Sequence, residues 1–347
     1  MQVTSIDPGS DPLWDALQSA PGAGLFHSPP WIGAVRDTYG FDVRAIVAIG
    51  DDGLPRGGLA FCEIEDLLGA RLVSLPFSDV CDPLIREAHA WPLLKAVLAE
   101  RRLPVTLRCL DERFLADDPD FTVTKRARWH TLPVEASADM LRAGFSDTTR
   151  RAIAKAERAG VEVRPLEGEE GLSGFTGLHA RLRKRKYRML AQPRCFFANI
   201  AERFGAGGGW HPLGAWHGDR LLAATVYLRW GDTLYYKFNA SDPDGLELRP
   251  NNLLVWAGVA LAKELGCRAL DLGPSDDDQP GLIRFKRAFG ATERELRFLR
   301  WTPPGCRAET GKELRGVLGE VTRLLTAPSI PDDVTTEAGN TLYRLFA

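Results

Sequence analysis

The sequence contains no hydrophobic run long enough to cross a membrane. No apolar stretch of the 347 residues reaches the ~18 that a spanning helix needs, and the longest, 253–262, lies between Asn252 and Lys263. The N-terminal residues are acidic and have neither a basic start nor an apolar stretch, so no export signal is visible. We expect a cytoplasmic protein without membrane insertion.

Cysteine and histidine are few and scattered. The six cysteines include no CxxC pair, and the six histidines show no HExxH spacing, so we expect no metal site. Cys62, Cys109 and Cys267 occur in apolar, strand-like runs, which favours buried thiols.

Three common catalytic motifs are also missing. There is no GxSxG, no Walker loop and no GxGxxG after a predicted strand. Hydrolase, nucleotide kinase and dinucleotide oxidoreductase functions therefore lose their usual support.

What is present is an order of predicted elements that occurs twice. β-branched and aromatic runs around Gly/Asp turns predict strands at 44–50, 56–65 and 70–79, and again at 211–218, 220–230 and 232–242. In each half a helix follows (89–102 and 250–266), then a short strand (103–110 and 267–273). The second half adds a helix at 281–289 and a strand at 293–301. The sequence thus predicts an α/β (α+β) fold of two tandem lobes, each a mixed, mostly antiparallel sheet flanked by helices.

A predominantly helical segment connects the two halves. Helices are predicted at 137–144, 147–159, 169–188 and 194–204, with a strand at 160–166. We place the lobe boundary near residue 135, which gives lobes at 1–135 and 136–302 and a C-terminal tail at 303–347. The tail is predicted to contain one amphipathic helix, 311–325, a proline-rich break and a short apolar end that docks on the body.

Positive charge is concentrated in this connection. Residues 145–194 carry 12 Lys/Arg against 6 Asp/Glu in a chain of formal net charge −2. A phosphate-rich ligand and a solvated helical surface both account for such a stretch. The interruption of the charges by Tyr187, Met189 and Leu190 weakens the second interpretation.

The start of the helix at 250–266 is a candidate anion site. Its first turn is Arg249-Pro250-Asn251-Asn252, and the amides and dipole of a helix N-terminus attract negative groups. Equally, Asn251 or Asn252 caps the helix and Arg249 is solvated.

Two further candidates follow. Asp271 ends an apolar strand before Gly273-Pro274-Ser275, a position where carboxylates line α/β sites or satisfy turn amides. Lys286 shares a short helix with Arg284 and Arg287, and one of these cations could face a cleft. Spacing alone favours a solvated helix face.

The sequence resembles the GNAT superfamily of acetyltransferases, and its doubled arrangement resembles the FemAB-like (BioF2-like) aminoacyl/acyltransferases. The segments that carry the resemblance are LFHSPPWIGAV (25–35), LVSLPFSDVCDPL (72–84), TRRAIAKAERAGVEV (149–163), LHARLRKRKYRMLAQPRCFF (178–197), YYKFNASD (235–242), LRPNNLLVWAGVALAKELG (248–266), LDLGPS (270–275) and GLIRFKRAFGA (281–291). The resemblance implies two GNAT-like lobes and transfer of an acyl group from an activated ester or thioester to an amine.

The resemblance also implies roles for individual residues. Lys286, next to Phe285, is expected near the developing negative charge, and Arg181 or Arg183 is a possible anion contact together with Ser275. The strands at 235–241 and 269–273 are expected to splay around the acyl group, which places Tyr236, Phe238 and Asn239 against the donor. Arg249, Asn251 and Asn252 stand where acetyl-CoA users have a glycine-rich loop, and no glycine occurs here.

The resulting hypothesis is an N-acyltransferase with Lys286 and Asp271 as catalytic residues. The donor is acyl-CoA or aminoacyl-tRNA used as a co-substrate, with no tightly bound cofactor, and the acceptor is a small-molecule or peptide amine. The first lobe binds the acceptor or supports the fold. The alternative is a non-catalytic module that binds an anionic metabolite or tRNA in the same cleft.

Overall fold

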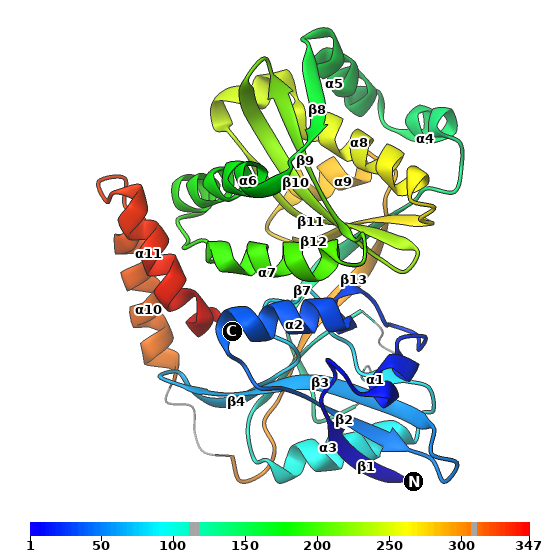
Figure 1. The fold of residues 1–347 in the computed structure, drawn as a ribbon. Coiled ribbons are helices and arrows are strands. Elements are labelled where there is room, and N and C mark those ends of the chain that lie inside the picture. The colour runs from blue at the N-terminus through cyan, green and yellow to red at the C-terminus, as the bar shows by residue number, and fades with distance from the viewer. Residues whose placement is uncertain (111–114, 116–117, 307–310) are drawn as a thin grey trace. The chain divides into compact units, whose positions relative to one another are not determined.

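The computed structural model describes residues 1–110, 115, 118–306 and 311–347, without the side chain of residue 312. The chain divides into two units (Figure 1). The first comprises Met1–Ala127, Glu295–Gly319 and Arg344–Ala347, and the second comprises Arg128–Arg294 and Glu320–Tyr343. Strands β7 (Thr122–Pro133) and β13 (Thr292–Trp301) contribute residues to both.

The first unit contains most of the N-terminal elements. They are β1 (Gln2–Ile6), α1 (Pro12–Leu17), η1 (Leu25–His27), α2 (Pro29–Tyr39), β2 (Val43–Ile49), β3 (Pro55–Asp66), β4 (Gly69–Val73), β5 (Leu84–Ile85), α3 (Ala90–Glu100) and β6 (Val105–Cys109). The strand order is β1-β2-β3-β4-β6-β13-β7, and β5 pairs with β3. Only β4 and β6 are parallel among the pairs with a described register in this unit.

Two adjacent glycines of β3 lie beneath helices on opposite faces of this sheet. A Cβ at Gly58 would lie 2.6 Å from Leu17 of α1, whereas a Cβ at Gly57 would lie 3.0 Å from Ala90 of α3. Successive residues of a strand face opposite sides, so α1 and α3 cover the two faces. The missing side chains allow both helices to approach the strand closely.

The second unit holds the remaining sheet and most of the helices. Its elements are α4 (Ala138–Gly144), α5 (Asp147–Arg158), β8 (Val161–Pro165), α6 (Gly168–Leu182), η2 (Arg183–Tyr187), α7 (Arg194–Gly205), β9 (Trp210–His217), β10 (Arg220–Trp230), β11 (Thr233–Ser241), η3 (Pro243–Leu248), α8 (Pro250–Glu264), β12 (Ala269–Asp276), α9 (Pro280–Arg287) and α11 (Asp332–Leu342). The strand order is β13-β7-β12-β11-β10-β9-β8. β8 to β11 are antiparallel neighbours, and β11 and β12 are parallel. Helix α10 (Gly311–Leu325) and η4 (Tyr343–Phe346) cross the unit boundaries.

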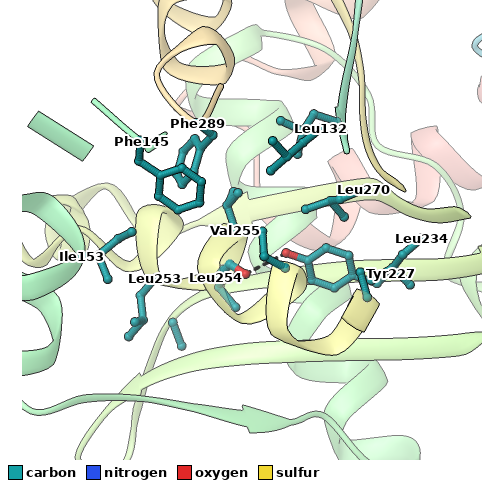
Figure 2. Packing of buried hydrophobic residues seen from close by; sticks show 14 of the residues in the cluster. Leu132, Phe145, Ile153, Tyr227, Leu234, Leu253, Leu254, Val255, Leu270 and Phe289 are labelled. Atoms are coloured by element: carbon teal, nitrogen blue, oxygen red, sulfur yellow. Dashed lines mark hydrogen bonds between the residues drawn. The ribbon is translucent and has the colours of Figure 1, made fainter. Parts of the chain in front are cut away.

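Helix α8 forms the centre of the second unit's core (Figure 2). It is apolar on nearly all sides, and Leu254, Val255 and Val259 are completely buried. The Tyr227 ring of β10 packs against the helix, and its hydroxyl donates a hydrogen bond of 2.8 Å to the carbonyl oxygen of Leu254. Gly258 makes this contact possible, because a Cβ there would lie 2.4 Å from the Tyr227 hydroxyl.

The predicted double β-β-β-α-β order is confirmed. It appears as β9-β10-β11-α8-β12 and, with the additional two-residue strand β5 before the helix, as β2-β3-β4-β5-α3-β6; the third predicted strand and the last one form a parallel pair in each series. The sheets are mostly antiparallel with helices on their faces, which confirms the predicted fold class. Cys62, Cys109 and Cys267 are buried thiols, as expected.

Three predictions of local structure were wrong in their extent. The strand predicted to end at residue 79 ends at Val73, because Pro76 cannot continue a ladder. The helix predicted for 169–188 ends as α6 at Leu182 and continues as the π-helical turn η2. The tail contains a second helix, α11, which the β-branched and glycine residues of 332–342 did not suggest.

Tertiary contacts explain why α11 forms. Lys184, 5% exposed, donates hydrogen bonds to Asp332 Oδ1 (2.6 Å) and to the carbonyl oxygen of Ile330. Gly339 lies against the backbone of Ala191, where a Cβ would come within 2.6 Å of the carbonyl oxygen.

Residues 307–310 of the predicted tail lie outside the described residues. In the described part of the chain, no helix combines the length and apolar character needed to cross a bilayer.

Replacing Gly258 with alanine is expected to destabilise the protein by about 1–3 kcal/mol, because the methyl group would displace the buried Tyr227 ring. Urea denaturation measures the free energy of unfolding. Gly316→Ala in α10, where a Cβ meets nothing within 4 Å, is the matched control and should be neutral or stabilising by up to about 1 kcal/mol. A Gly258→Ala protein as stable as the Gly316→Ala protein would contradict the packing described here.

Candidate active site

The parallel ladder between β11 and β12 is short. It consists of three pairs and ends at Tyr235–Asp271, although β11 continues to Ser241 and β12 to Asp276. On its other side β11 stays paired with β10 as far as Ser241. From residue 236 onward the two parallel strands share no ladder pair among the described residues. A strand edge outside a ladder presents amide and carbonyl groups to whatever lies beside it.

A bulge in β11 coincides with this divergence. Val226 of β10 pairs with Phe238, but the next residue, Tyr227, pairs with Tyr236, so β11 holds one additional residue, Lys237. Thr225 pairs with Asn239, and Thr225 and Tyr227 lie on the same face of β10. Tyr236 and Asn239 therefore share a face although they are three positions apart, which a regular strand would not allow.

A polar network joins the shared face to the start of α8. The Asn239 side-chain amide donates to Thr225 Oγ1 at 2.9 Å and to Asn251 Oδ1 at 3.2 Å. Thr225 is completely buried and also hydrogen-bonds the Tyr236 side chain. Burial raises the pKa of Tyr236 above its ordinary value despite this bond, so its hydroxyl is neutral near pH 7. Three of the predicted donor-binding residues are thus brought together by a threonine that the sequence analysis did not select.

The start of α8 differs from the expected asparagine cap. The N-cap residue is Arg249, with left-handed backbone (φ 61°) and no capping side chain, so the capping interpretation of Asn251 and Asn252 was wrong. Arg249 is exposed, and Pro250 at the first helical position has no N–H. The amide of Asn252 bonds the carbonyl oxygen of Arg249 at 3.1 Å.

Phe238 lies on the opposite face of β11. The centre of its ring lies 5.1 Å from that of Phe197 and 6.1 Å from that of Phe196, both in α7. The Lys237 ammonium lies over the Phe238 ring, 4.7 Å from its centre. His179 of α6 packs edge-on against Phe238 and Phe197. Phe238 therefore belongs to an aromatic cluster under α6 and α7, whereas Tyr236 and Asn239 lie toward α8.

Asp271 is buried, and hydrogen bonds hold its carboxylate in place. Oδ2 accepts from the Trp129 indole N–H at 2.7 Å, and Oδ1 accepts from the Gly273 amide at 2.7 Å. Gly273 has φ 68°, a conformation that glycine adopts without a Cβ penalty. The hydrogen bond to the Gly273 amide is the contact with a turn amide that the position of Asp271 allowed. The Trp129 side chain comes from the strand β7.

Lys286 is 4% exposed, in contrast to the solvated face that its spacing favoured. Its ammonium donates to the carbonyl oxygens of Gly273 (3.0 Å) and Pro274 (2.7 Å). The neighbouring cations Arg284 and Arg287 are exposed, and Arg287 pairs with Glu293. Gly273 thus links both predicted catalytic residues, through its amide to Asp271 and through its carbonyl to Lys286.

Ser275 directly follows this turn in β12, and Phe285 precedes Lys286 in α9. Ser275 is 1% exposed, and its hydroxyl has no hydrogen-bond partner in the described part of the chain. Phe285 is half-buried, with its ring 5.2 Å from that of Phe289 in the α8 core.

The two candidate arginines of the basic segment are placed differently. Arg183 Nε donates to the carbonyl oxygen of Leu190 at 3.1 Å and so fixes the chain after η2. Arg181 is exposed at the end of α6, where its charge contributes to lowering the pKa of Asp242, chiefly lowered by Arg220. Among the described residues, no hydrogen bond or ion pair links either arginine to Lys286 or Asp271.

His130 and Trp129 are polar residues of this region that the sequence analysis missed. The His130 side chain is completely buried, with Nδ1 3.4 Å from Glu293 Oε1. Burial, and then the charge of Lys286, lower the pKa of His130 to about 4. Both residues lie in β7, which is next to β12 in the sheet. No local signal in the sequence could place them, because the Trp129–Asp271 contact spans 142 positions.

Comparisons with known proteins agree with this architecture. Residues 143–287 match the family model of the acetyltransferase (GNAT) domain. Similar solved structures include FemX (TM-score 0.64, 14% identity, 92% of this chain and 100% of that one) and L-PGS from Bacillus licheniformis (0.54, 15%, 91% and 96%). A tandem GNAT protein from the clavulanic acid biosynthesis pathway is also similar (0.56, 14%, 86% and 97%). No significant match was found among curated proteins.

Residues 143–287, all in the second unit, are therefore the part of the chain that is similar to the acetyltransferase (GNAT) domain family. The whole chain has a fold similar to that of FemX and of the tandem GNAT protein, since the similarity to both extends over most of its length.

The buried, uncharged His130 predicts a pH dependence of stability. Its folded pKa, about 4, lies below the ordinary 6.5, so between these values the unfolded chain binds more protons and stability falls as the pH is lowered. His130→Asn should reduce the slope of the unfolding free energy between pH 6.5 and 4, measured by urea denaturation. His217→Asn, at an exposed histidine of the same unit, should leave the slope unchanged. Equal slopes for wild type and His130→Asn would show that His130 is protonated in the folded protein.

Proposed function

We propose that the protein is an N-acyltransferase that moves an acyl or aminoacyl group from an activated thioester or ester to an amine. The observation that carries this proposal is the divergence of β11 and β12 beyond Tyr235–Asp271, together with the buried Lys286 of α9, whose ammonium contacts β12 just after that point. In the proposed complex the acyl carbonyl of the donor lies between the diverging strands, against the edge of β11.

The proposed reaction needs little covalent help from the protein. The acceptor nitrogen attacks the donor carbonyl carbon, a C–N bond forms, and the C–S or C–O bond to the leaving group breaks. The leaving group departs with the electron pair, and the amine loses one proton. Because the donor is already activated, most of the acceleration comes from holding the two reactants together.

Lys286 supplies positive charge where the tetrahedral oxyanion develops. The carbonyl oxygens of Gly273 and Pro274 orient the ammonium before substrate binds, so little reorganisation accompanies the reaction. Burial lowers the local dielectric and strengthens the interaction. One such donor contributes roughly 3–4 kcal/mol.

Asp271 is the proposed proton acceptor, directly or through a water molecule. The Trp129 indole and the Gly273 amide orient its carboxylate and stabilise the ionised form that can accept a proton.

The donor is proposed to be acyl-CoA or aminoacyl-tRNA, in contact with Tyr236, Phe238, Asn239 and Phe285. The start of α8 favours aminoacyl-tRNA, because Pro250 removes one amide from the helix terminus that would hold a pyrophosphate. Arg249, Asn251 and Asn252 are the proposed polar contacts there, and Arg181, Arg183 and Ser275 the proposed phosphate contacts. The basic stretch 145–194 suits an anionic donor of either kind.

The first lobe, 1–135, is proposed to bind the acceptor or to support the catalytic lobe, 136–302. The acceptor is a small molecule or a peptide with a primary amine.

Incubation with labelled acyl-CoA or labelled aminoacyl-tRNA, each with a mixed pool of amines, tests the function. Labelled amide from either donor supports the proposal and identifies the donor class. Binding of a donor without product from any amine would instead indicate the alternative, a binding module that uses the same cleft.

Replacing Lys286 with methionine should lower turnover by about 100- to 1,000-fold, since an oxyanion-stabilising charge is lost. Arg284→Met, an exposed cation of the same helix, should retain wild-type turnover. Circular dichroism and thermal unfolding confirm that both variants are folded. A folded Lys286→Met enzyme with unchanged turnover would remove Lys286 from the mechanism.

A further inference from the structure

The first unit contains a pocket of about 660 Å³ that is rich in arginine. Five arginines line it, together with a single carboxylate, Glu65: Arg71, Arg101, Arg102, Arg300 and Arg315. They come from β4, the turn that follows α3, the end of β13 and helix α10. The pocket therefore gathers positive charge from segments far apart in the sequence.

Internal acidic partners account for only part of this charge. Arg71 is nearly buried and forms a two-point ion pair with Asp66 at 2.9 and 3.0 Å. Arg101 Nη1 lies 3.3 Å from Glu63 Oε2, and both side chains are more than 40% exposed. Arg102 and Arg315 have no ion-pair partner among the described residues.

Arg102 occupies a position that ordinarily belongs to glycine. Helix α3 has its C-cap at Arg101, and Arg102 follows it with φ 51°. Helices commonly end with glycine in this left-handed conformation, because a Cβ there is unfavourable. The backbone conformation alone would favour glycine at position 102. The position of the arginine side chain at the pocket gives a reason for arginine instead.

We propose that this pocket binds a small molecule that carries phosphate groups. Guanidinium groups bind phosphate oxygens in two-point geometry, and several of them around one cavity suit a multiply charged anion. The volume lies within the range of small-ligand pockets, and Leu68, Leu103 and Pro104 provide apolar wall for the remainder of the ligand. A concave site of this size favours a discrete metabolite over an extended nucleic-acid backbone.

The pocket and the proposed acyl-transfer site are formed by residues of different units. It lies where the parallel strands β4 and β6 begin, whereas the proposed site lies where the corresponding strands β11 and β12 diverge toward their ends. The inference therefore does not rest on the proposed function, and either can fail alone.

Calorimetric titration of the full chain with inorganic pyrophosphate tests the proposal. We expect binding that depends on the arginines of this pocket, with an affinity that falls as the salt concentration rises. Arg102→Gly should weaken binding by about 10- to 100-fold, the equivalent of one lost charge-assisted contact. Glycine adopts φ 51° without strain, so thermal stability should be equal or higher and misfolding cannot explain the loss.

Arg284→Met is the control, because Arg284 is an exposed arginine of the second unit that lies outside the pocket and outside the basic stretch 145–194. It should bind pyrophosphate like wild type, while Arg315→Met should lose affinity as Arg102→Gly does. Absence of pyrophosphate binding by wild type, or equal affinities of Arg102→Gly and Arg284→Met, would overturn the proposal. So would binding of a single-stranded RNA oligonucleotide or of anionic phospholipid vesicles without binding of pyrophosphate.

Discussion

The peptide unit of Gly273 is the constraint on which the second unit's site depends. Its amide is bonded to Asp271 and its carbonyl to Lys286, so one backbone turn fixes a buried carboxylate and a buried ammonium together. The positive φ of Gly273 gives this turn its shape, and a side chain there would be strained. Burial of two opposite charges is tolerated because hydrogen bonds compensate for their lost hydration.

The bulge in β11 complements this turn from the neighbouring strand. The additional residue, Lys237, changes the side-chain parity, so that Tyr236 and Asn239 face the buried Thr225 while Phe238 faces the aromatic cluster. A regular strand would have divided these residues differently between the two faces. The divergence from β12 and the bulge occur within the same few residues, so the end of the β11–β12 ladder and a group of polar side chains lie in one place.

The two units share an order of strands and helices but differ in the polar residues that surround the parallel strand pair. Each has a parallel strand pair after a core helix, but the second unit has the lysine-bearing helix α9, and the first has an arginine pocket where its parallel pair begins. This division follows from local differences. The left-handed Arg102, together with Gly305 and Arg315, lines the pocket, whereas the turn at Gly273 holds the two candidate catalytic residues.

The sequence by itself determined the repeated order of strands and helices, since alternation, helical periodicity and turn residues are local signals, and it singled out Lys286 and Asp271 as candidates. It did not determine that Lys286 is buried while Arg284 is exposed, because helical spacing does not say which face meets the sheet. Only the tertiary structure brought Trp129 to Asp271, across 142 positions, and placed Thr225 between Tyr236 and Asn239. Strand pairing and register are non-local, and a single-residue bulge reverses a face without leaving a local signature.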